Sequence, residues 1–348
     1  MKVLVIGGTR FVGRHFVTAA LARGHELTLF NRGTSTPFDG VATIHGDRHR
    51  DLDRLAGRRW DVVVDTCGLL PRAVRASAEA LRDAVGAYVF ISSQSVYGDV
   101  SRPGVDESAP LETLTEEQLD KANGIDPSAA SAVTYGDMYG GLKVLCEQAA
   151  EEVLPGRVLV VRPGLIVGPY DYTDRFTYWV ARVARGGEVL APGRSGRHVQ
   201  FIDARDLGEW LLTMIEKRRT GVYNGNGLPG AVTMGQLLDE CKTVSGSDAS
   251  FVWADEEFLI REQVRAWSEL PLWLPESEPS LRGFMFANVD KAVDDGLTFR
   301  SLTETVADTL AWHQTRASSA EMKAGLDPQK EEKLLSIYNT FAPKLSSV

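Results

Sequence analysis

Short apolar runs alternate with longer segments of helical spacing through most of this chain of 348 residues. The apolar runs have the length of buried strands, and segments rich in alanine and leucine follow several of them. This alternation predicts an α/β fold in which helices cover both faces of a parallel sheet. The predicted strands lie at residues 3–6, 26–30, 41–44, 61–65, 88–91, 158–161 and 221–224.

The first apolar run ends in a glycine-rich turn at the start of a helical segment. A pyrophosphate can lie on the N–H groups of a helix N-terminus only where no side chain holds the backbone away, and the helix dipole favours its negative charge. Arg10 stands where the three-glycine fingerprint has its second glycine. The turn nevertheless predicts a Rossmann-type, doubly wound dinucleotide-binding fold. Its expected contacts are Gly7, Gly8, Thr9, Arg10, Phe11, Val12 and Gly13.

The end of the second predicted strand bears on the choice of cofactor. In such folds the residues after this strand meet the adenosine ribose, and an acid there would repel a 2′-phosphate. Asn31 and Arg32 offer a neutral side chain and a cation instead. NADP(H) is therefore favoured. NAD(H) stays open, because Arg32 could equally be a solvated loop residue.

Small and polar residues follow the next strands at the same edge of the sheet. Asp47 comes after the third strand, where it could meet the adenine or cap a turn. His45 and His49 lie nearby among arginines, and we expect no metal site there. The carboxyl ends of the later strands border the cofactor in such a sheet. The residues expected there are Thr66, Cys67, Gly68, Ser92, Pro163 and Gly164.

A serine and a tyrosine–lysine pair carry the candidate chemistry. Ser93 follows the fifth strand, and residues 99–133 after it are polar and contain several prolines and glycines. Such a stretch predicts a long excursion without packed elements, of the kind that forms lids or binding loops. In the helical segment beyond it, Tyr139 and Lys143 are one turn apart on one face. A cation near a tyrosine lowers its ordinary pKa of about 10, so that it can exchange a proton near neutral pH.

At these residues the sequence resembles the extended short-chain dehydrogenase/reductase superfamily, which includes UDP-galactose epimerases, sugar-nucleotide dehydratases and related reductases. The likeness covers about residues 1–313 and rests on the glycine turn, on SSQSVYG, on YGGLK, on RPGLIVGP and on QFIDARD. It implies an NAD(P)-dependent enzyme in which Tyr139 is the general acid/base and Ser93 hydrogen-bonds the reacting oxygen. Lys143 would lower the pKa of the tyrosine and bind the nicotinamide ribose. The resemblance also makes a homodimer through this helix one expected assembly.

Three departures narrow the resemblance. Arg10 makes the turn GGTRFVG similar to that of a chloroplast RNA-binding group with the same fold. Gln94 and Ser95 stand where the dehydratases carry an Asp-Glu pair, so a dehydration would lack its acid and base. Val199 replaces the arginine that usually meets a substrate pyrophosphate. A nucleotide-sugar substrate is therefore not favoured.

The later part of the chain is expected to build a smaller C-terminal substrate domain. We assign residues 1–165 and about 199–227 to the dinucleotide-binding domain, and about 166–198 and 228–316 to the substrate domain. Residues 317–348 are expected to form a charged helical tail whose amphipathic face is solvated rather than a partner site.

Two stretches of this part are candidates for substrate contact. PGRSGRH, at residues 192–198, is basic and flexible, and it either closes over an anionic or polar substrate or is a solvated loop. WSELPLWLP, at residues 267–275, is broken by prolines, and it forms either an apolar substrate wall or core between the domains. The residues expected to meet substrate are Gln94, Ser95, Arg194, Arg197, Gln200, Trp267 and Trp273.

Charge and composition limit the classes of function. With 38 basic and 47 acidic residues, the net charge of −9 disfavours binding to nucleic acid or anionic membranes. The three cysteines lack metal-ligand spacing and are expected to be reduced core thiols. No apolar run is long enough for a membrane span, and the first one is too short for a signal peptide. A cytoplasmic protein is expected.

The favoured hypothesis is an NADP(H)-dependent oxidoreductase that reduces a carbonyl of a small metabolite by hydride transfer. An epimerase or isomerase of a sugar or sugar nucleotide with retained NAD would use the same catalytic residues, so these do not separate the two. A non-catalytic nucleotide- or RNA-binding protein of the same fold is the third hypothesis. The RNA-binding form of it disagrees with the acidic charge.

Overall fold

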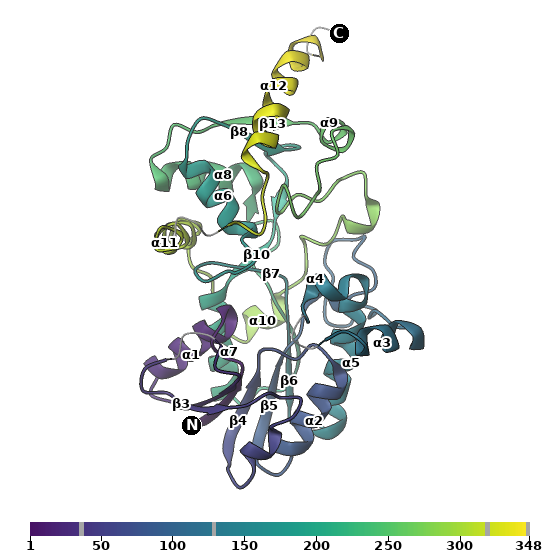
Figure 1. Cartoon of the computed structure of the whole chain (residues 1–348), viewed down its shortest axis with the longest axis vertical. Helices are drawn as coiled ribbons and strands as arrows, with labels where there is room; N and C mark the ends of the chain where they lie inside the picture. Colours follow the sequence, from purple (N-terminus) through teal and green to yellow (C-terminus); the bar gives the residue numbers. More distant parts are fainter. Residues whose placement is uncertain (35–37, 127–129, 317–320, 346–348) are drawn as a thin grey trace.

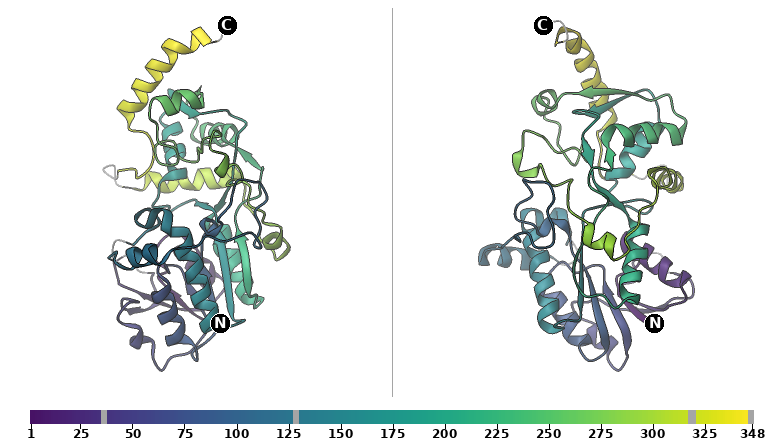
Figure 2. Two further views of the ribbon diagram at one scale, coloured as in Figure 1. Left: turned by 90° about the vertical axis from the view of Figure 1, so that its right-hand side faces the viewer. Right: turned by 180° about the vertical axis from the view of Figure 1, so that it is seen from behind.

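We describe the protein from a computed structural model, in which residues 1–34, 38–126, 130–316 and 321–345 are described. Figure 1 shows a lower lobe built on one sheet and an upper lobe that ends in a long helix at the C-terminus. The side and back views in Figure 2 show that the two lobes are stacked along the long axis and that several segments of the chain pass between them.

The lower lobe contains a sheet of seven strands in the order β11-β6-β5-β4-β1-β2-β3. All its neighbouring strands are parallel. With β1 inside the sheet between β4 and β2, this is the Rossmann-type doubly wound order, and the predicted α/β fold is confirmed. The strands are β1 (Lys2–Ile6), β2 (Glu26–Asn31), β3 (Ala42–His45), β4 (Trp60–Asp65), β5 (Val85–Ile91), β6 (Val158–Pro163) and β11 (Gly221–Gly225).

Helices cover both faces of this sheet, namely α1 (Phe11–Ala22), α2 (Pro71–Leu81), α5 (Tyr139–Val153) and α7 (Ala204–Glu216). α1 packs against α7 on one face, and α2 packs against α5 on the other. Leu4 and Val5 of β1 belong to two different apolar clusters, because successive side chains of a strand point to opposite faces. The sheet is therefore buried on both sides, with its carboxyl edge left for ligands.

The upper lobe has its own apolar core, which includes Phe176, Trp179, Leu238 and Trp273. Its main elements are α6 (Arg175–Ala184), β8 (Glu188–Pro192), α8 (Met234–Ser245), β13 (Ser250–Ala254), α9 (Glu256–Arg261), α11 (Leu302–Gln314) and α12 (Pro328–Leu345). β8 and β13 form a parallel pair. Phe176, Leu238 and Trp273 lie far apart in the sequence, so long-range packing builds this lobe.

Short strands lie where the chain crosses between the lobes. They are β7 (Leu165–Val167), paired with β10 (Phe201–Asp203), and β9 (His198–Val199), paired with β12 (Val232–Thr233). The remaining helices are α3 (Glu116–Asn123), α4 (Ala132–Tyr135) and α10 (Asp290–Asp294), with 3₁₀ turns at Leu52–Leu55, Gln94–Val96, Gly136–Met138 and Pro279–Leu281.

The predicted excursion at residues 99–133 is not free of packed elements. It contains α3, whose N-terminus has a capping box between Thr115 and Gln118. Backbone hydrogen bonds attach the excursion to a distant segment, from Gly283 N to Val100 O at 2.8 Å and from Gly104 N to Phe286 O at 2.7 Å. The expectation of a structureless loop is wrong here, because local capping and these bonds order it.

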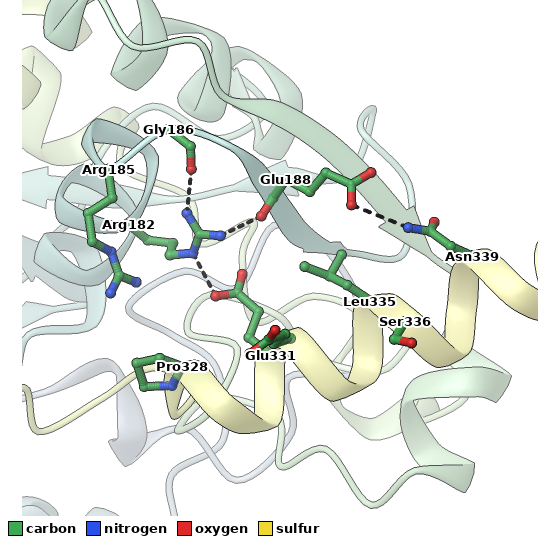
Figure 3. A pocket seen from close by; sticks show the side chains of 10 residues that line it. Arg182, Arg185, Gly186, Glu188, Pro328, Glu331, Leu335, Ser336 and Asn339 are labelled. Carbon is green, nitrogen blue, oxygen red and sulfur yellow. Dashed lines mark hydrogen bonds and ion pairs between the residues drawn. The ribbon is translucent and has the colours of Figure 1, made fainter.

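The C-terminal tail is not wholly solvated either. Leu334 and Leu335 of α12 belong to the core of the upper lobe. Figure 3 shows the pocket between α6 and α12, where Glu331 accepts a hydrogen bond from Arg182 at 2.6 Å. Glu331 also accepts from the backbone N–H of Leu190 at 3.1 Å. The first turns of α12 are thus part of the upper lobe, and the predicted domain boundaries remain predictions.

The cysteines differ in their surroundings. Cys146 and Cys241 are buried free thiols, whereas Cys67 is exposed, so the prediction of a core thiol is wrong for Cys67. The reason is its position in the open turn after β4. Within the described ranges, no group of three His, Cys, Asp or Glu side chains could hold a metal ion, and no helix is both long and apolar enough to cross a bilayer.

Candidate active site

The glycine turn joins β1 to α1 with a geometry that only glycine allows. Gly7 and Gly8 have φ values of 95° and 81°, which side chains rarely adopt. A β-carbon on Gly13 would lie 2.7 Å from the Cα of Gly8, so the turn and the first turn of α1 are in direct contact. A β-carbon on Gly7 would lie 2.6 Å from Oγ1 of Thr66. The turn therefore presents bare backbone at the edge of the sheet.

The N-terminus of α1 fits the pyrophosphate of a dinucleotide. Arg10 is the N-cap residue, and its side chain makes no capping hydrogen bond. The first turn of α1 contains no acidic residue. The first N–H groups of the helix are thus left without a side-chain acceptor, which suits a bound anion.

The end of β2 carries no acid. The amide of Asn31 donates to the Gly7 carbonyl at 3.4 Å and accepts from Gly33 N at 2.9 Å, so it braces the turn. Arg32 is exposed beside it. Asp47 accepts from the backbone N–H of His49 at 2.9 Å. Asp47 therefore caps the turn, which is one of its two predicted roles.

The residues after β4 lie against the glycine turn and Lys143. Oγ1 of Thr66 donates to the Ile6 carbonyl at 3.0 Å and accepts from Gly8 N at 3.3 Å. The carbonyl of Gly68 accepts from Nζ of Lys143 at 2.7 Å. This stretch thus connects the glycine turn to α5.

Ser93 and Tyr139 are brought together by a close approach of two elements. Tyr139 is the first residue of α5, and Ser93 caps the 3₁₀ turn that follows β5. A β-carbon on Gly140 would lie 2.0 Å from the Ser95 carbonyl oxygen, so only glycine lets the helix come this near. Burial raises the pKa of Tyr139 to about 12, and the nearby hydroxyl of Ser93 opposes that rise. The net shift is opposite to the predicted lowering, because burial dominates.

Lys143 is buried beneath this pair. Its ammonium donates to the carbonyls of Gly68 and Ile91, both at 2.7 Å, and lies 4.2 Å from the centre of the Phe90 ring. Burial lowers the pKa of the lysine. An ammonium has three N–H donors, and the two carbonyls use two of them. The third is available to a ribose hydroxyl.

A buried ion pair that sequence analysis missed lies behind the catalytic residues. Glu147, one turn after Lys143 on α5, pairs with Arg162 through two hydrogen bonds of 2.7 and 3.0 Å. Ser92 donates its hydroxyl to the same carboxylate. The hydroxyl of Ser92 is therefore committed to this pair, and a cofactor contact by Ser92 stays a prediction. The RPG motif contains Arg162, but nothing in the sequence indicates its partner.

Two of the predicted substrate ligands are structural in this protein. Gln200 is buried, and its side-chain amide binds the carbonyls of Gly227 and Ala287 and the N–H of Ala287. Trp273 is 1% exposed and lies in the core of the upper lobe. The prediction of substrate contact is wrong for both side chains, because packing and backbone hydrogen bonds already occupy them.

The other predicted substrate ligands lie in different surroundings. Arg194 is exposed and pairs with Glu276 at 2.9 Å, and Arg197 is half-buried near the same glutamate. Gln94 is buried and links the carbonyl of Phe284 to the side-chain amide of Asn226. Ser95 and Trp267 are half-buried. Pro163 and Gly164, at the end of β6, lie beside Gln94 and Asn226.

A cluster at the start of α6 was not predicted. Asp171, Tyr172 and Arg175 follow the RPGLIVGP turn, and the charge of Arg175 acts on Tyr139. The ring of Tyr172 lies 6.3 Å from that of Phe11, at the glycine turn. The only sequence signal is the polar stretch DYTDR between two apolar segments.

The fold and this site define a dinucleotide-binding α/β protein with a serine, a tyrosine and a lysine at one strand end. The model of the NAD dependent epimerase/dehydratase family matches residues 3–225. The chain therefore belongs to this family.

Relatives and solved structures agree with this assignment. The chain is 26% identical over 271 residues to the chloroplast stem-loop binding protein of 41 kDa b from Arabidopsis thaliana, covering 70% of this chain but 63% of that protein. It is 27% identical over 263 residues to 2-alkyl-3-oxoalkanoate reductase from Stenotrophomonas maltophilia, covering 68% of this chain and 75% of the relative. The UDP-N-acetylglucosamine 4-epimerase of Bacillus cereus has a similar fold, with a TM-score of 0.65 at 15% identity over 92% of this chain and 99% of that one.

Proposed function

We propose that this protein is an NADP(H)-dependent oxidoreductase that reduces a carbonyl group of a small metabolite. The close approach of Tyr139, at the start of α5, to the turn that carries Ser93 is the observation that supports this most. Because burial raises the pKa of Tyr139 to about 12, the phenol is protonated at neutral pH. A reductase needs its acid protonated in advance, since the carbonyl oxygen must gain a proton. An oxidation would require the costly phenolate.

Each catalytic residue has a part in this reaction. A bound nicotinamide cofactor supplies the hydride to the carbonyl carbon. Tyr139 donates its phenolic proton to the carbonyl oxygen, and Ser93 donates a hydrogen bond to the same oxygen. Lys143, held by two carbonyls, offers its remaining N–H to a ribose hydroxyl. Arg32 is the cation for a 2′-phosphate, at a strand end without an acid.

The Stenotrophomonas maltophilia relative supports the substrate class. Its name describes reduction of an oxo group in an alkanoate. The aromatic side chains of Tyr172 and Trp267 near the catalytic end of the sheet suit a substrate with an apolar part. We therefore propose 3-oxo compounds as the first substrates to test.

The test starts with the cofactor. Purified protein is checked for bound nucleotide and then titrated with NADPH and NADH by nicotinamide fluorescence. We expect reversible NADPH binding that is tighter than NADH binding. Oxidation of NADPH is then followed with 3-oxo compounds, and Tyr139→Phe should lower kcat by about 100-fold or more while leaving the Kd of NADPH unchanged. A Tyr139→Phe protein that turns over normally refutes the proposal.

An epimerase with retained NAD is the second candidate. Membership of the NAD dependent epimerase/dehydratase family favours it, and the same three residues would serve. NAD that remains bound through purification and resists exchange would support this alternative. Failure to bind either nucleotide would refute both enzymes and leave the non-catalytic hypothesis.

A further inference from the structure

Arg175 is a cation that forms no ion pair among the described residues, and its charge acts on the catalytic Tyr139. It is the first residue of α6 and is half-buried. In the described part of the chain its guanidinium has no hydrogen bond and no ion pair. By contrast, other arginines of the upper lobe are paired, Arg182 with Glu331 and Arg316 with Asp174. Burying a charge without a partner is costly, which points to a ligand at this position.

The guanidinium is held against an aromatic wall. It lies 5.3 Å from the centre of the Trp267 ring, and that ring meets Phe284 edge to face at 5.6 Å. Trp267 has a φ of 64°, an uncommon backbone conformation for a bulky residue. The turn thus holds the indole under Arg175 at a cost in backbone strain, which is typical of functional sites.

This wall adjoins the catalytic residues. The carbonyl of Phe284 accepts a hydrogen bond from Gln94 at 2.5 Å, and Gln94 directly follows Ser93. The positive charge of Arg175 is close enough to lower the pKa of Tyr139 against the effect of burial. Arg175 and the aromatic wall therefore adjoin the catalytic residues Ser93 and Tyr139.

The charges around Arg175 favour a single anionic group. Asp171, Tyr172 and Tyr139 are the titratable groups that act on it. Asp171 does not form an ion pair with it among the described residues, and its Oδ2 is buried without a hydrogen-bond partner. Of the other basic candidates, Arg194 is already paired with Glu276, and Arg197 lies near the same glutamate. One unpaired guanidinium fits one carboxylate, whereas a diphosphate would need several cations.

We propose that Arg175 is the substrate-recognition residue, and that it binds a carboxylate carried by the carbonyl substrate while Trp267 supports the guanidinium from behind. The planar fork of arginine matches the two oxygens of a carboxylate. The substrate is then an oxo acid whose carbonyl faces Tyr139 and whose carboxylate faces Arg175. This inference rests on the proposed function for its reaction, but the anion site can be measured without turnover.

Binding is tested with a carboxylate that cannot be reduced. Hexanoate and its neutral analogue hexanamide are titrated into the NADPH-loaded protein by calorimetry. We expect hexanoate to bind at least about tenfold more tightly, and Arg175→Gln to abolish this preference. Arg175→Lys should retain part of it, because an ammonium keeps the charge without the fork. Equal binding of the two probes, or binding of neither, refutes the inference.

A matched control separates the site from the helix. Arg185→Gln makes the same change at the other end of α6, where the side chain is exposed. Both variants should unfold at the temperature of the wild-type protein within a few degrees. Only the Arg175 variant should lose hexanoate binding. If Arg185→Gln loses it equally, the effect is one of general surface charge and the inference fails.

Kinetics distinguish this inference from the proposed function. With 3-oxohexanoate as substrate, Arg175→Gln should raise KM about tenfold or more and change kcat little, and with the methyl ester it should change neither. If acid and ester are reduced equally well by both proteins, the reductase stands and the carboxylate site is refuted. If neither is reduced but hexanoate binding still requires Arg175, the anion site stands and the proposed reaction does not.

Discussion

Replacing Glu147 by Gln tests whether a buried ion pair holds the catalytic elements together. Glu147 and Arg162 are 6% and 3% exposed, and two hydrogen bonds join them. The glutamine keeps an acceptor for Ser92 but leaves the guanidinium of Arg162 buried without a counter-charge. Removing one charge of such a pair costs about 3–5 kcal/mol of unfolding free energy. Because glutamine keeps an acceptor, we expect a loss of about 3 kcal/mol.

The measurement is equilibrium unfolding in urea, followed by tryptophan fluorescence. Glu152→Gln is the matched control, because Glu152 lies on the same helix and pairs with Arg75 at the surface. That exposed pair should contribute less than about 1 kcal/mol. Salt should weaken the Arg75 pair and leave the buried pair unchanged, because screening acts on exposed charges. If Glu147→Gln unfolds within 1 kcal/mol of the wild-type protein, the reasoning is wrong.

Two further predictions concern the upper lobe. Burial raises the pKa of Asp171 from 3.8 to about 6. The folded state therefore binds this proton more tightly than the unfolded state, and the resulting contribution to stability grows as the pH falls through 6. Asp171→Asn should therefore stabilise the protein by about 2 kcal/mol at pH 7.5 and by nothing near pH 4 in thermal unfolding; an equal effect at both pH values would contradict the assignment. Glu331→Gln should leave Arg182 without its counter-charge and speed amide hydrogen exchange in α12, whereas unchanged exchange there would show that the pair does not hold the helix.

The sheet and the placement of Tyr139 and Lys143 on one helix could be predicted because their signals are local. Apolar runs of strand length give β1 to β6 and β11, and a one-turn spacing gives Tyr139 and Lys143 on α5. α3 had a local signal as well, since Thr115 and Gln118 have the spacing of a capping box. The prolines and glycines around α3, however, are typical of a loop.

The rest of the site depends on contacts between distant residues. In the sequence Arg48 resembles an exposed loop arginine. In the structure it is buried and donates two hydrogen bonds of 2.8 Å to Asp65. Arg175 gives no sign in the sequence that it lies over Trp267, 92 positions later. Which polar side chain meets a ligand and which one joins two backbone segments is decided by the folded chain, as Gln200 demonstrates.

Gln200 also limits how the molecule can move. Its amide joins the crossing segment after β9 to Gly227 and Ala287. Hydrogen bonds therefore connect three of the segments that pass between the lobes. Rotating one lobe about a flexible linker would break these buried hydrogen bonds, each of which would leave a polar group unpaired. These hydrogen bonds therefore oppose hinge motion between the two lobes.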